Sequence, residues 1–167
     1  MRILAIDPGS EQSAYVLLDT GSFAVHHAFI EPTEEVVAAL TLARRGSADE
    51  LAIEMISCYG MAVGKSVFET CVNIGRFQQA FGSATLVYRP DIKLHLCNSR
   101  RAKDANVRQA LLDRFPPTGG GATPQIGTKG KTGPLYSVKS HLWAALAVAV
   151  YRADQIRDAQ LVEARER

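Results

Sequence analysis

The chain has 167 residues, of which 47% are hydrophobic and 22% are charged, and these values are ordinary for one globular domain with a full-sized core. Its longest apolar run, Leu142 to Tyr151, is about half of the roughly 20 residues that a membrane span needs, so we expect no transmembrane helix. The three cysteines lack a C-x-x-C spacing and the N-terminus lacks the apolar run of a signal peptide, which predicts a cytoplasmic protein with reduced thiols.

Positive charge is concentrated in one part of the chain. Residues 89–139 contain ten Lys and Arg residues against three Asp residues, a net +7, which leaves −5 for the rest of a chain whose formal charge is +2. A basic block of this size favours a polyanionic partner, although a solvated surface would have the same composition.

The first thirty residues predict three strands joined by tight turns. Residues 2–6 form a first strand with four apolar residues in a row, and residues 13–18 are mostly apolar and partly β-branched. The turn signal Asp19-Thr20-Gly21 then leads into a partner strand over residues 23–29.

Helices and strands are expected to alternate through the next part of the chain. Apolar spacing and capping signals predict helices over 32–46, 64–81 and 102–115, and strands over 50–56 and 84–88. The segment 91–99 is ambiguous. The order of elements predicts an α/β fold, with a mixed five-stranded sheet and helices on both faces, in which three antiparallel strands precede the alternation.

The C-terminal third completes a single domain over residues 1–167. Residues 116–134 are poor in apolar side chains and rich in Gly, Pro, Thr and Lys, which predicts a mobile loop rather than a domain linker. A last helix over 140–158 is apolar nearly all round at its start, so it is expected to lie flat against the sheet. The charged tail over 159–167 is expected to fray.

Three residues on separate elements form a candidate metal site. Asp7 ends the first strand immediately before Pro8-Gly9, where a carboxylate can face a metal or phosphate, although a capping role would explain it equally well. Glu54 lies in an apolar strand, where a carboxylate is costly to bury unless it is paired or bound to a cation. If the two strands are neighbours, both acids lie together and suit Mg²⁺ or Mn²⁺, with His141 at the start of the last helix as a third ligand. A lone His there is more often only a satisfied polar residue.

Several segments follow one another in an order that is typical of a known family: Ile-Asp-Pro-Gly-Ser at 6–10, Ala-Ile-Glu at 52–54 and Val-Lys-Ser-His-Leu-Trp-Ala-Ala-Leu-Ala-Val-Ala at 138–149. Tyr-Arg-Pro at 88–90 with Lys93, and Ala-Lys at 102–103, are similar to further segments of that family. The chain thus resembles the RuvC family of Holliday junction resolvases, within the RNase H-like superfamily, over nearly its whole length.

The resemblance implies an RNase H-like nuclease: a homodimeric, Mg²⁺-dependent endonuclease that cuts four-way junctions or other branched DNA. It also implies Mn²⁺ as a substitute ion, no nucleotide cofactor and a bacterial or phage-encoded protein. The catalytic and metal-binding residues would be Asp7, bridging two ions, with Glu54 on one ion and His141 on the other, in two-metal phosphodiester hydrolysis. The family has another ligand three residues after His141, where this chain has Ala144. Either three ligands with water suffice, or a neighbour such as Asp104 substitutes, or the site is inactive.

The resemblance also indicates where DNA and a second subunit would bind. Five basic residues of the charged block are expected to hold phosphates: Arg100, Arg101, Lys103, Lys129 and Lys131. Tyr59 is a candidate for an aromatic side chain that stacks at the junction, with a core role as the alternative. The predicted helix over 64–81 is a candidate dimer interface. Its expected apolar face consists of Val67, Cys71, Ile74, Phe77 and Phe81, and a plain core role would explain the two phenylalanines as well.

Two other functions agree with part of the sequence. A catalytically weak module that binds branched DNA is favoured by Ala144. An ATP-binding protein of the ASKHA type (sugar kinases and heat-shock ATPases) is favoured only by the strand that ends in Asp-x-Gly. The sequence shows no second glycine-rich phosphate loop, and 167 residues are short for the two lobes of that fold.

Overall fold

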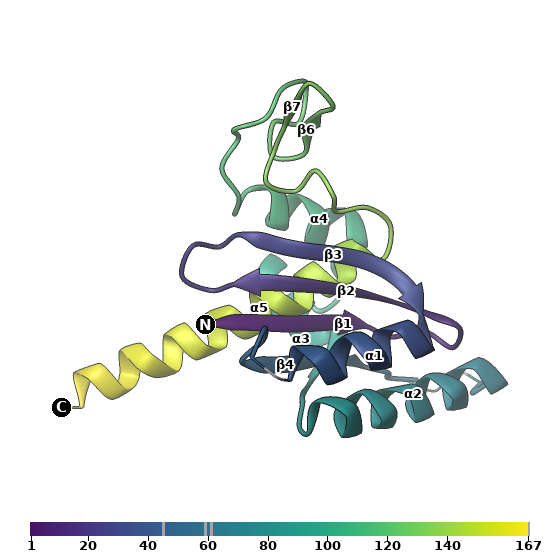
Figure 1. Ribbon diagram of the computed structural model, residues 1–167. Helices are drawn as coiled ribbons and strands as arrows, with labels where there is room; N and C mark the ends of the chain where they lie inside the picture. Colours follow the sequence, from purple (N-terminus) through teal and green to yellow (C-terminus); the bar gives the residue numbers. More distant parts are fainter. Residues whose placement is uncertain (45, 59, 61, 167) are drawn as a thin grey trace.

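A computed structural model describes residues 1–44, 46–58, 60 and 62–166 of the chain. In chain order, the elements are β1 (Arg2–Asp7), β2 (Gln12–Asp19), β3 (Val25–Pro32), α1 (Thr33–Ala43), β4 (Glu50–Met55), α2 (Lys65–Phe81), β5 (Thr85–Tyr88), α3 (Arg89–Cys97), α4 (Asp104–Leu112), β6 (Gly127–Thr128), β7 (Lys131–Thr132) and α5 (Leu142–Arg165) (Figure 1). The ambiguous segment 91–99 is therefore mostly helical, because α3 begins directly after β5.

The main sheet is mixed and has the strand order β3-β2-β1-β4-β5. The strands β1, β2 and β3 are antiparallel, whereas β4 and β5 run parallel to β1. This arrangement confirms the α/β fold expected from the sequence, in which three antiparallel strands precede an alternation of helices and strands. It also places β1 and β4 side by side.

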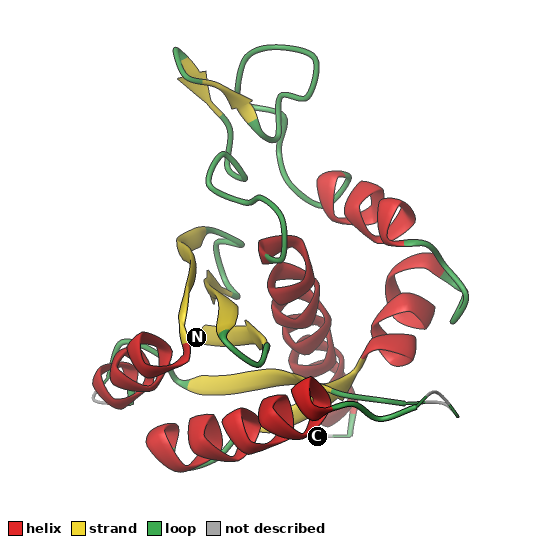
Figure 2. Ribbon diagram, turned by 90° about the vertical axis from the view of Figure 1, so that its right-hand side faces the viewer, coloured by secondary structure: helices red, strands yellow, loops and turns green. Residues whose placement is uncertain are grey.

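Helices cover both faces of the sheet (Figure 2). Along β1 the side chains alternate: Leu4 and Ile6 pack toward α1 and α2, whereas Ile3 and Ala5 pack toward α5. The helices α3 and α4 add their apolar side chains to the core on the α5 side. Asp7, two residues beyond Ala5, therefore belongs to the α5 face.

The helix α5 lies flat on the sheet, as expected from its apolar start. Its residues 145–150 are fully buried, and the small side chains among them allow a close approach to β1 and β2. The helix continues to Arg165, so the tail that was expected to fray over 159–167 is helical as far as that residue. Ala, Glu, Gln, Leu and Arg, which favour helices, extend it past the sheet edge (Figure 1). Within the described residues, no helix is both long and apolar enough to cross a membrane.

Residues 116–134 have more structure than the loop predicted from composition. They contain the short hairpin β6–β7, which projects away from the main sheet (Figure 1). Backbone segments lie so close together here that a Cβ atom at Gly127, whose φ is +82°, would stand 2.3 Å from the amide nitrogen of Gly133. Glycine is therefore required at this position for close packing of the segment. The mobility of residues 116–134 stays a prediction.

The buried face of α2 differs from the predicted one. Thr70, Asn73, Ile74 and Phe77 are buried, whereas Cys71 is exposed, so the expectation that Cys71 belongs to the apolar face was wrong. Polar residues take part in the buried face because they bind the backbone that follows β1. The Nδ2 atom of Asn73 donates to the carbonyl oxygens of Gly9 and Ser10, each at 3.0 Å.

The turn after Asp7 is held tightly by these contacts. A Cβ atom at Gly9 would lie 2.2 Å from the carbonyl oxygen of Gln12, so the chain can close this turn only with glycine. The amide of Gly9 donates to Ser13 Oγ at 3.1 Å, and Asn73 is also 3.3 Å from Thr33 Oγ1. Together these bonds fix the direction in which Asp7 leaves the sheet.

Replacing Asn73 with alanine should lower the free energy of unfolding by about 1–3 kcal/mol, because two carbonyl oxygens lose a buried donor. Urea denaturation measures this loss. The matched control is Gln79→Ala, at an exposed position of the same helix, which should change the free energy of unfolding little. Equal effects of the two substitutions would show that the Asn73 bonds do not hold the turn.

Candidate active site

Asp7 and Glu54 lie at neighbouring strand ends. The parallel register pairs Ile6 with Ile53, so the two acids are the next residues along β1 and β4. Both belong to the α5 face, because Ala5 and Ala52 pack into the core on that side. Their side chains are largely buried, with exposed fractions of 20% for Asp7 and 15% for Glu54. The structure thus brings together the two carboxylates that were predicted from the sequence to share a site.

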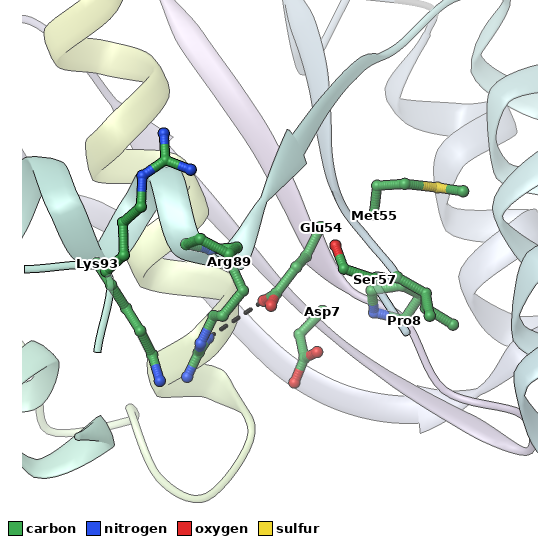
Figure 3. A pocket seen from close by; sticks show the side chains of 10 residues that line it. Asp7, Pro8, Glu54, Met55, Ser57, Arg89 and Lys93 are labelled. Carbon is green, nitrogen blue, oxygen red and sulfur yellow. Dashed lines mark hydrogen bonds and ion pairs between the residues drawn. The ribbon is translucent and has the colours of Figure 1, made fainter. Parts of the chain in front are cut away.

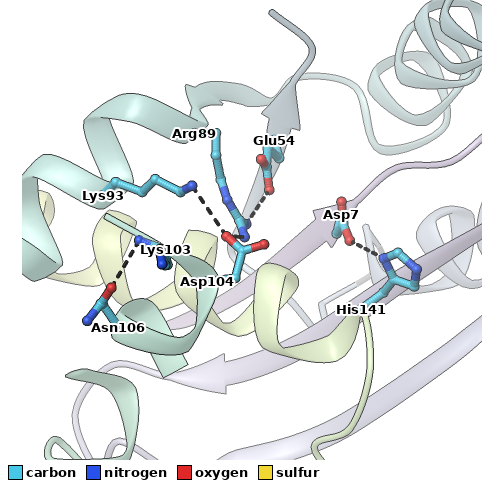
Figure 4. Close-up of polar contacts among 8 residues, drawn as sticks. All are labelled: Asp7, Glu54, Arg89, Lys93, Lys103, Asp104, Asn106 and His141. Carbon is cyan, nitrogen blue, oxygen red and sulfur yellow. Dashed lines mark hydrogen bonds and ion pairs between the residues drawn. The ribbon is translucent and has the colours of Figure 1, made fainter. Parts of the chain in front are cut away.

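His141 reaches the same place from the helix that covers the face. It is the N-cap residue of α5, and its Nδ1 atom lies 3.1 Å from Asp7 Oδ2 (Figure 4). The imidazole is 75% exposed, so it lies at the solvent side of the site. His141 therefore contacts Asp7, whereas Glu54 contacts a different partner.

That partner is Arg89, which was not selected as a site residue from the sequence. Its Nη1 atom donates to Glu54 Oε2 at 3.2 Å, and its Nη2 atom donates to Asp104 Oδ1 at 2.9 Å (Figure 4). The register pairs Met55 with Tyr88, so the residue that follows β5 lies at the same sheet edge as Glu54. A basic residue directly after a strand that neighbours an acidic strand end is the signal that could have identified it.

The residues surround a cleft of about 380 Å³. Asp7 and Glu54 line it next to each other, and Arg89 and Lys93 line one side (Figure 3). A second cavity of about 340 Å³ shares Asp7 with the first and is lined by His141 and the turn at Gly9. Asp7 therefore stands between two open spaces, where it can contact a ligand from either side.

Burial dominates the electrostatics of the two carboxylates. It raises the pKa of Glu54 to about 7, although the Arg89 guanidinium opposes this rise, and the Asp7 charge adds to it. Burial likewise raises the pKa of Asp7 against the opposing influence of His141. By contrast, the hydrogen bond from Arg89 lowers the pKa of the more exposed Asp104. The positive charge around the cleft thus offsets only part of the cost of burying the two carboxylates.

The donor set suits a hard divalent cation. Mg²⁺ commonly keeps several waters and uses only one or two protein carboxylates, which Asp7 and Glu54 supply on the wall of one cleft. In the described part of the chain, no group of three or more His, Cys, Asp or Glu side chains is arranged to hold a metal ion. Ala144 offers no ligand, and the Asp104 carboxylate is held by Arg89 and Lys93.

The basic residues predicted to bind DNA are exposed at two places. Arg100 lines the main cleft and pairs with Asp91 at 3.1 Å, and Arg101 and Lys103 follow it before α4. Lys129 and Lys131 lie on the β6–β7 hairpin. Tyr59, the candidate stacking residue, lies outside the described residues.

Substituting Glu54 with glutamine should stabilise the metal-free protein at high pH. The folded state retains the Glu54 proton up to about pH 7, whereas the unfolded chain releases it near 4.5. The unfolded state therefore binds fewer protons in this window, and stability falls as the pH rises through it. Glutamine cannot ionise, so the variant should exceed the parent in free energy of unfolding by about 1–3 kcal/mol at pH 8 and by little at pH 4.

Urea denaturation at several pH values, with a chelator present, measures this difference. Glu69→Gln, at a more exposed carboxylate on α2, is the control and should show no such trend. A difference between the Glu54 variant and the parent that does not grow with pH would contradict the electrostatic account of the cleft.

The fold is similar to that of proteins whose structures have been solved. No protein-family model and no curated protein matches the sequence. The structure of Thermus thermophilus RuvC is similar with a TM-score of 0.67 and 18% sequence identity, covering 95% of this chain and 97% of that chain. The T. thermophilus RuvC in complex with a Holliday junction substrate is similar with a TM-score of 0.68 and 17% identity, covering 95% of this chain and 96% of that chain. The protein therefore has a RuvC-like, RNase H-like fold along almost its entire length.

Proposed function

We propose that the protein is a divalent-metal-dependent endonuclease that cuts four-way junctions or other branched DNA. The observation that carries the proposal is the pair of buried carboxylates, Asp7 and Glu54, at adjacent strand ends beside a cleft. A shared fold does not by itself assign an activity, so the argument depends on this site. The similar RuvC structure in complex with a Holliday junction supports branched DNA as the substrate class.

Asp7 and Glu54 would hold the ion, and His141 would complete its surroundings. A bound divalent ion would supply an activated water and stabilise negative charge on the scissile phosphate. The residues themselves would orient that centre: β1 and β4 fix the two carboxylates, and the close approach of Gly9 to Gln12 fixes the turn that follows Asp7. The raised pKa values of both acids support a cation here, because added positive charge would favour their ionised forms. The family resemblance implies two ions.

The basic block would bind the DNA backbone. Arg100, Arg101 and Lys103 lie near the cleft and would hold phosphates close to the cut, whereas Lys129 and Lys131 would reach more distant ones. Such contacts give affinity and position without reading sequence. A cytoplasmic location, in a bacterium or a phage-infected cell, stays a prediction.

A homodimer is part of the proposal, since two active sites related by a two-fold axis match symmetric cleavage of a junction. The helix α2 supports it with an exposed apolar face. Phe68 and Val72, one turn apart, are 64% and 63% exposed. Neither residue contributes to the core, so both are available to a second copy of the chain.

A branched-DNA binding module without catalysis is the second candidate. The observation that favours it is Ala144, which lies on α5 one turn after His141 and supplies no ligand. Nicking of a four-way junction that depends on Mg²⁺ or Mn²⁺ separates the enzyme from the module.

Replacing Asp7 with asparagine should lower the cleavage rate by about 10²-fold or more, because the ion would lose a charged ligand worth several kcal/mol of transition-state stabilisation. Binding of an immobile four-way junction should stay unchanged or become tighter, since repulsion of phosphates is reduced. Gel-based cleavage and binding assays with Mg²⁺ measure both quantities. Cleavage by the variant at the parent rate would exclude Asp7 as a metal ligand.

Replacing Lys103 with alanine should weaken junction binding and reduce the slope of log affinity against log salt by about one unit, as for one lost phosphate contact. Lys65→Ala is the control, because that exposed lysine belongs to α2 on the opposite face of the sheet. Fluorescence anisotropy at several salt concentrations gives the slopes. Identical slopes for the two variants would remove Lys103 from the DNA-binding surface.

A further inference from the structure

Arg89 occupies a central position in the cleft. Its guanidinium lies between Glu54 and Asp104, and the side chain is only 25% exposed. Two fixed elements hold it, because β5 ends immediately before it and Pro90 follows it in the first turn of α3. The hydrogen bonds to the two carboxylates use two N–H groups of a guanidinium that carries five, and the planar fork suits phosphate oxygens.

The charges around the cleft leave room for one divalent ion. Asp7 and Glu54 together carry two negative charges when ionised, which one divalent ion neutralises. Asp104 is already paired with Arg89 and Lys93, and Ala144 adds no charge. A second divalent ion would therefore lie close to a guanidinium without a further carboxylate to offset the repulsion.

We propose that the Arg89 guanidinium contacts the scissile phosphate and supplies the positive charge that a second metal ion would supply, so that the site works with a single divalent ion. This inference rests on the proposed nuclease function and concerns the same cleft. Glu54 and Asp104 hold the guanidinium in place, which makes its charge available without reorganisation during the reaction.

The reaction itself is a balanced hydrolysis. A water oxygen bonds to phosphorus and loses a proton to solvent, while the bond from phosphorus to the departing sugar oxygen breaks and that oxygen gains a proton. The products are a phosphomonoester and an alcohol. Arg89 donates hydrogen bonds to the non-bridging oxygens as their negative charge grows, and it transfers no proton.

The structure provides a matched control for substitution of Arg89. Arg152 pairs with Glu50 at the opposite end of β4, and the exposed fractions are 25% and 18%, against 25% and 15% for Arg89 and Glu54. Arg89→Ala and Arg152→Ala each remove a partly buried arginine from a glutamate on the same strand. Only the first removes charge from the cleft.

The first measurement is cleavage of a four-way junction by both variants at saturating Mn²⁺. Arg89→Ala should lose about 10²–10³-fold in rate, as expected for a lost charge-stabilising donor, whereas Arg152→Ala should cut like the parent. Arg89→Lys, which keeps the charge but lacks the planar fork, should fall between Arg89→Ala and the parent. Thermal unfolding of both alanine variants checks that their stability losses are similar.

The second measurement counts ions without using activity. Electron paramagnetic resonance of Mn²⁺ titrated into DNA-free protein should give one bound ion per chain in the parent and in Arg89→Ala. The cleavage rate of the parent should rise with Mn²⁺ with a Hill slope near one.

Four results would overturn the inference: two bound ions in the parent, cleavage by Arg89→Ala at the parent rate or faster, equal loss of cleavage in Arg152→Ala, or loss of Mn²⁺ binding in Arg89→Ala. The last would mean that Arg89 only positions Glu54. A parent protein that cuts no branched DNA with Mg²⁺ or Mn²⁺ would instead refute the proposed function, and the inference with it. If the parent cuts branched DNA and any of the four results above is obtained, the inference fails while the proposed function stands.

Discussion

Two carboxylates buried next to each other at the ends of parallel strands determine which side chains surround them in the site. Burial removes the solvent that would stabilise the charges of Asp7 and Glu54, and the charge of Asp7 adds to the cost of ionising Glu54. The surrounding elements each bring a polar partner to this place: α5 supplies His141, and the start of α3 supplies Arg89. Arg89 in turn draws Asp104 from α4 toward the cleft.

The sheet and its coverage could be predicted from the sequence because their signals are local and repeated. Strand alternation and turn residues locate β1, β2 and β3, and the strand order follows from the switch to alternating helices and strands. Buried side chains that bind partners distant in the sequence were harder to predict. The polar residues buried in α2, led by Asn73, contradict a simple apolar stripe because their partners lie in the turn at Gly9 and Ser10.

The same difference between local signals and distant partners decides how well the site could be predicted. Asp7 and Glu54 stand out because an acid in an apolar strand is unusual, and His141 because it opens a late apolar helix; the resemblance to a family supported all three. Arg89 lies in a block of ten basic residues, and only its position directly after a strand distinguishes it from a surface residue. Its role in the cleft depends on the register between β4 and β5, which a single sequence does not reveal. The close packing of the β6–β7 segment was also hidden, since its glycine-rich composition resembles that of a structureless loop.

The alternation of side chains along β1 ties the site to the core. Ile3, Ala5 and Asp7 share one face, and Leu4 and Ile6 share the other. A deletion of one residue within β1 would turn the side chains on one side of the deletion to the opposite face, so Asp7 and the earlier core side chains could not both keep their faces. Such a chain would lose its fold together with its site. Stable but inactive descendants of this protein should therefore arise by replacement of side chains, and hardly ever by insertion or deletion in this strand.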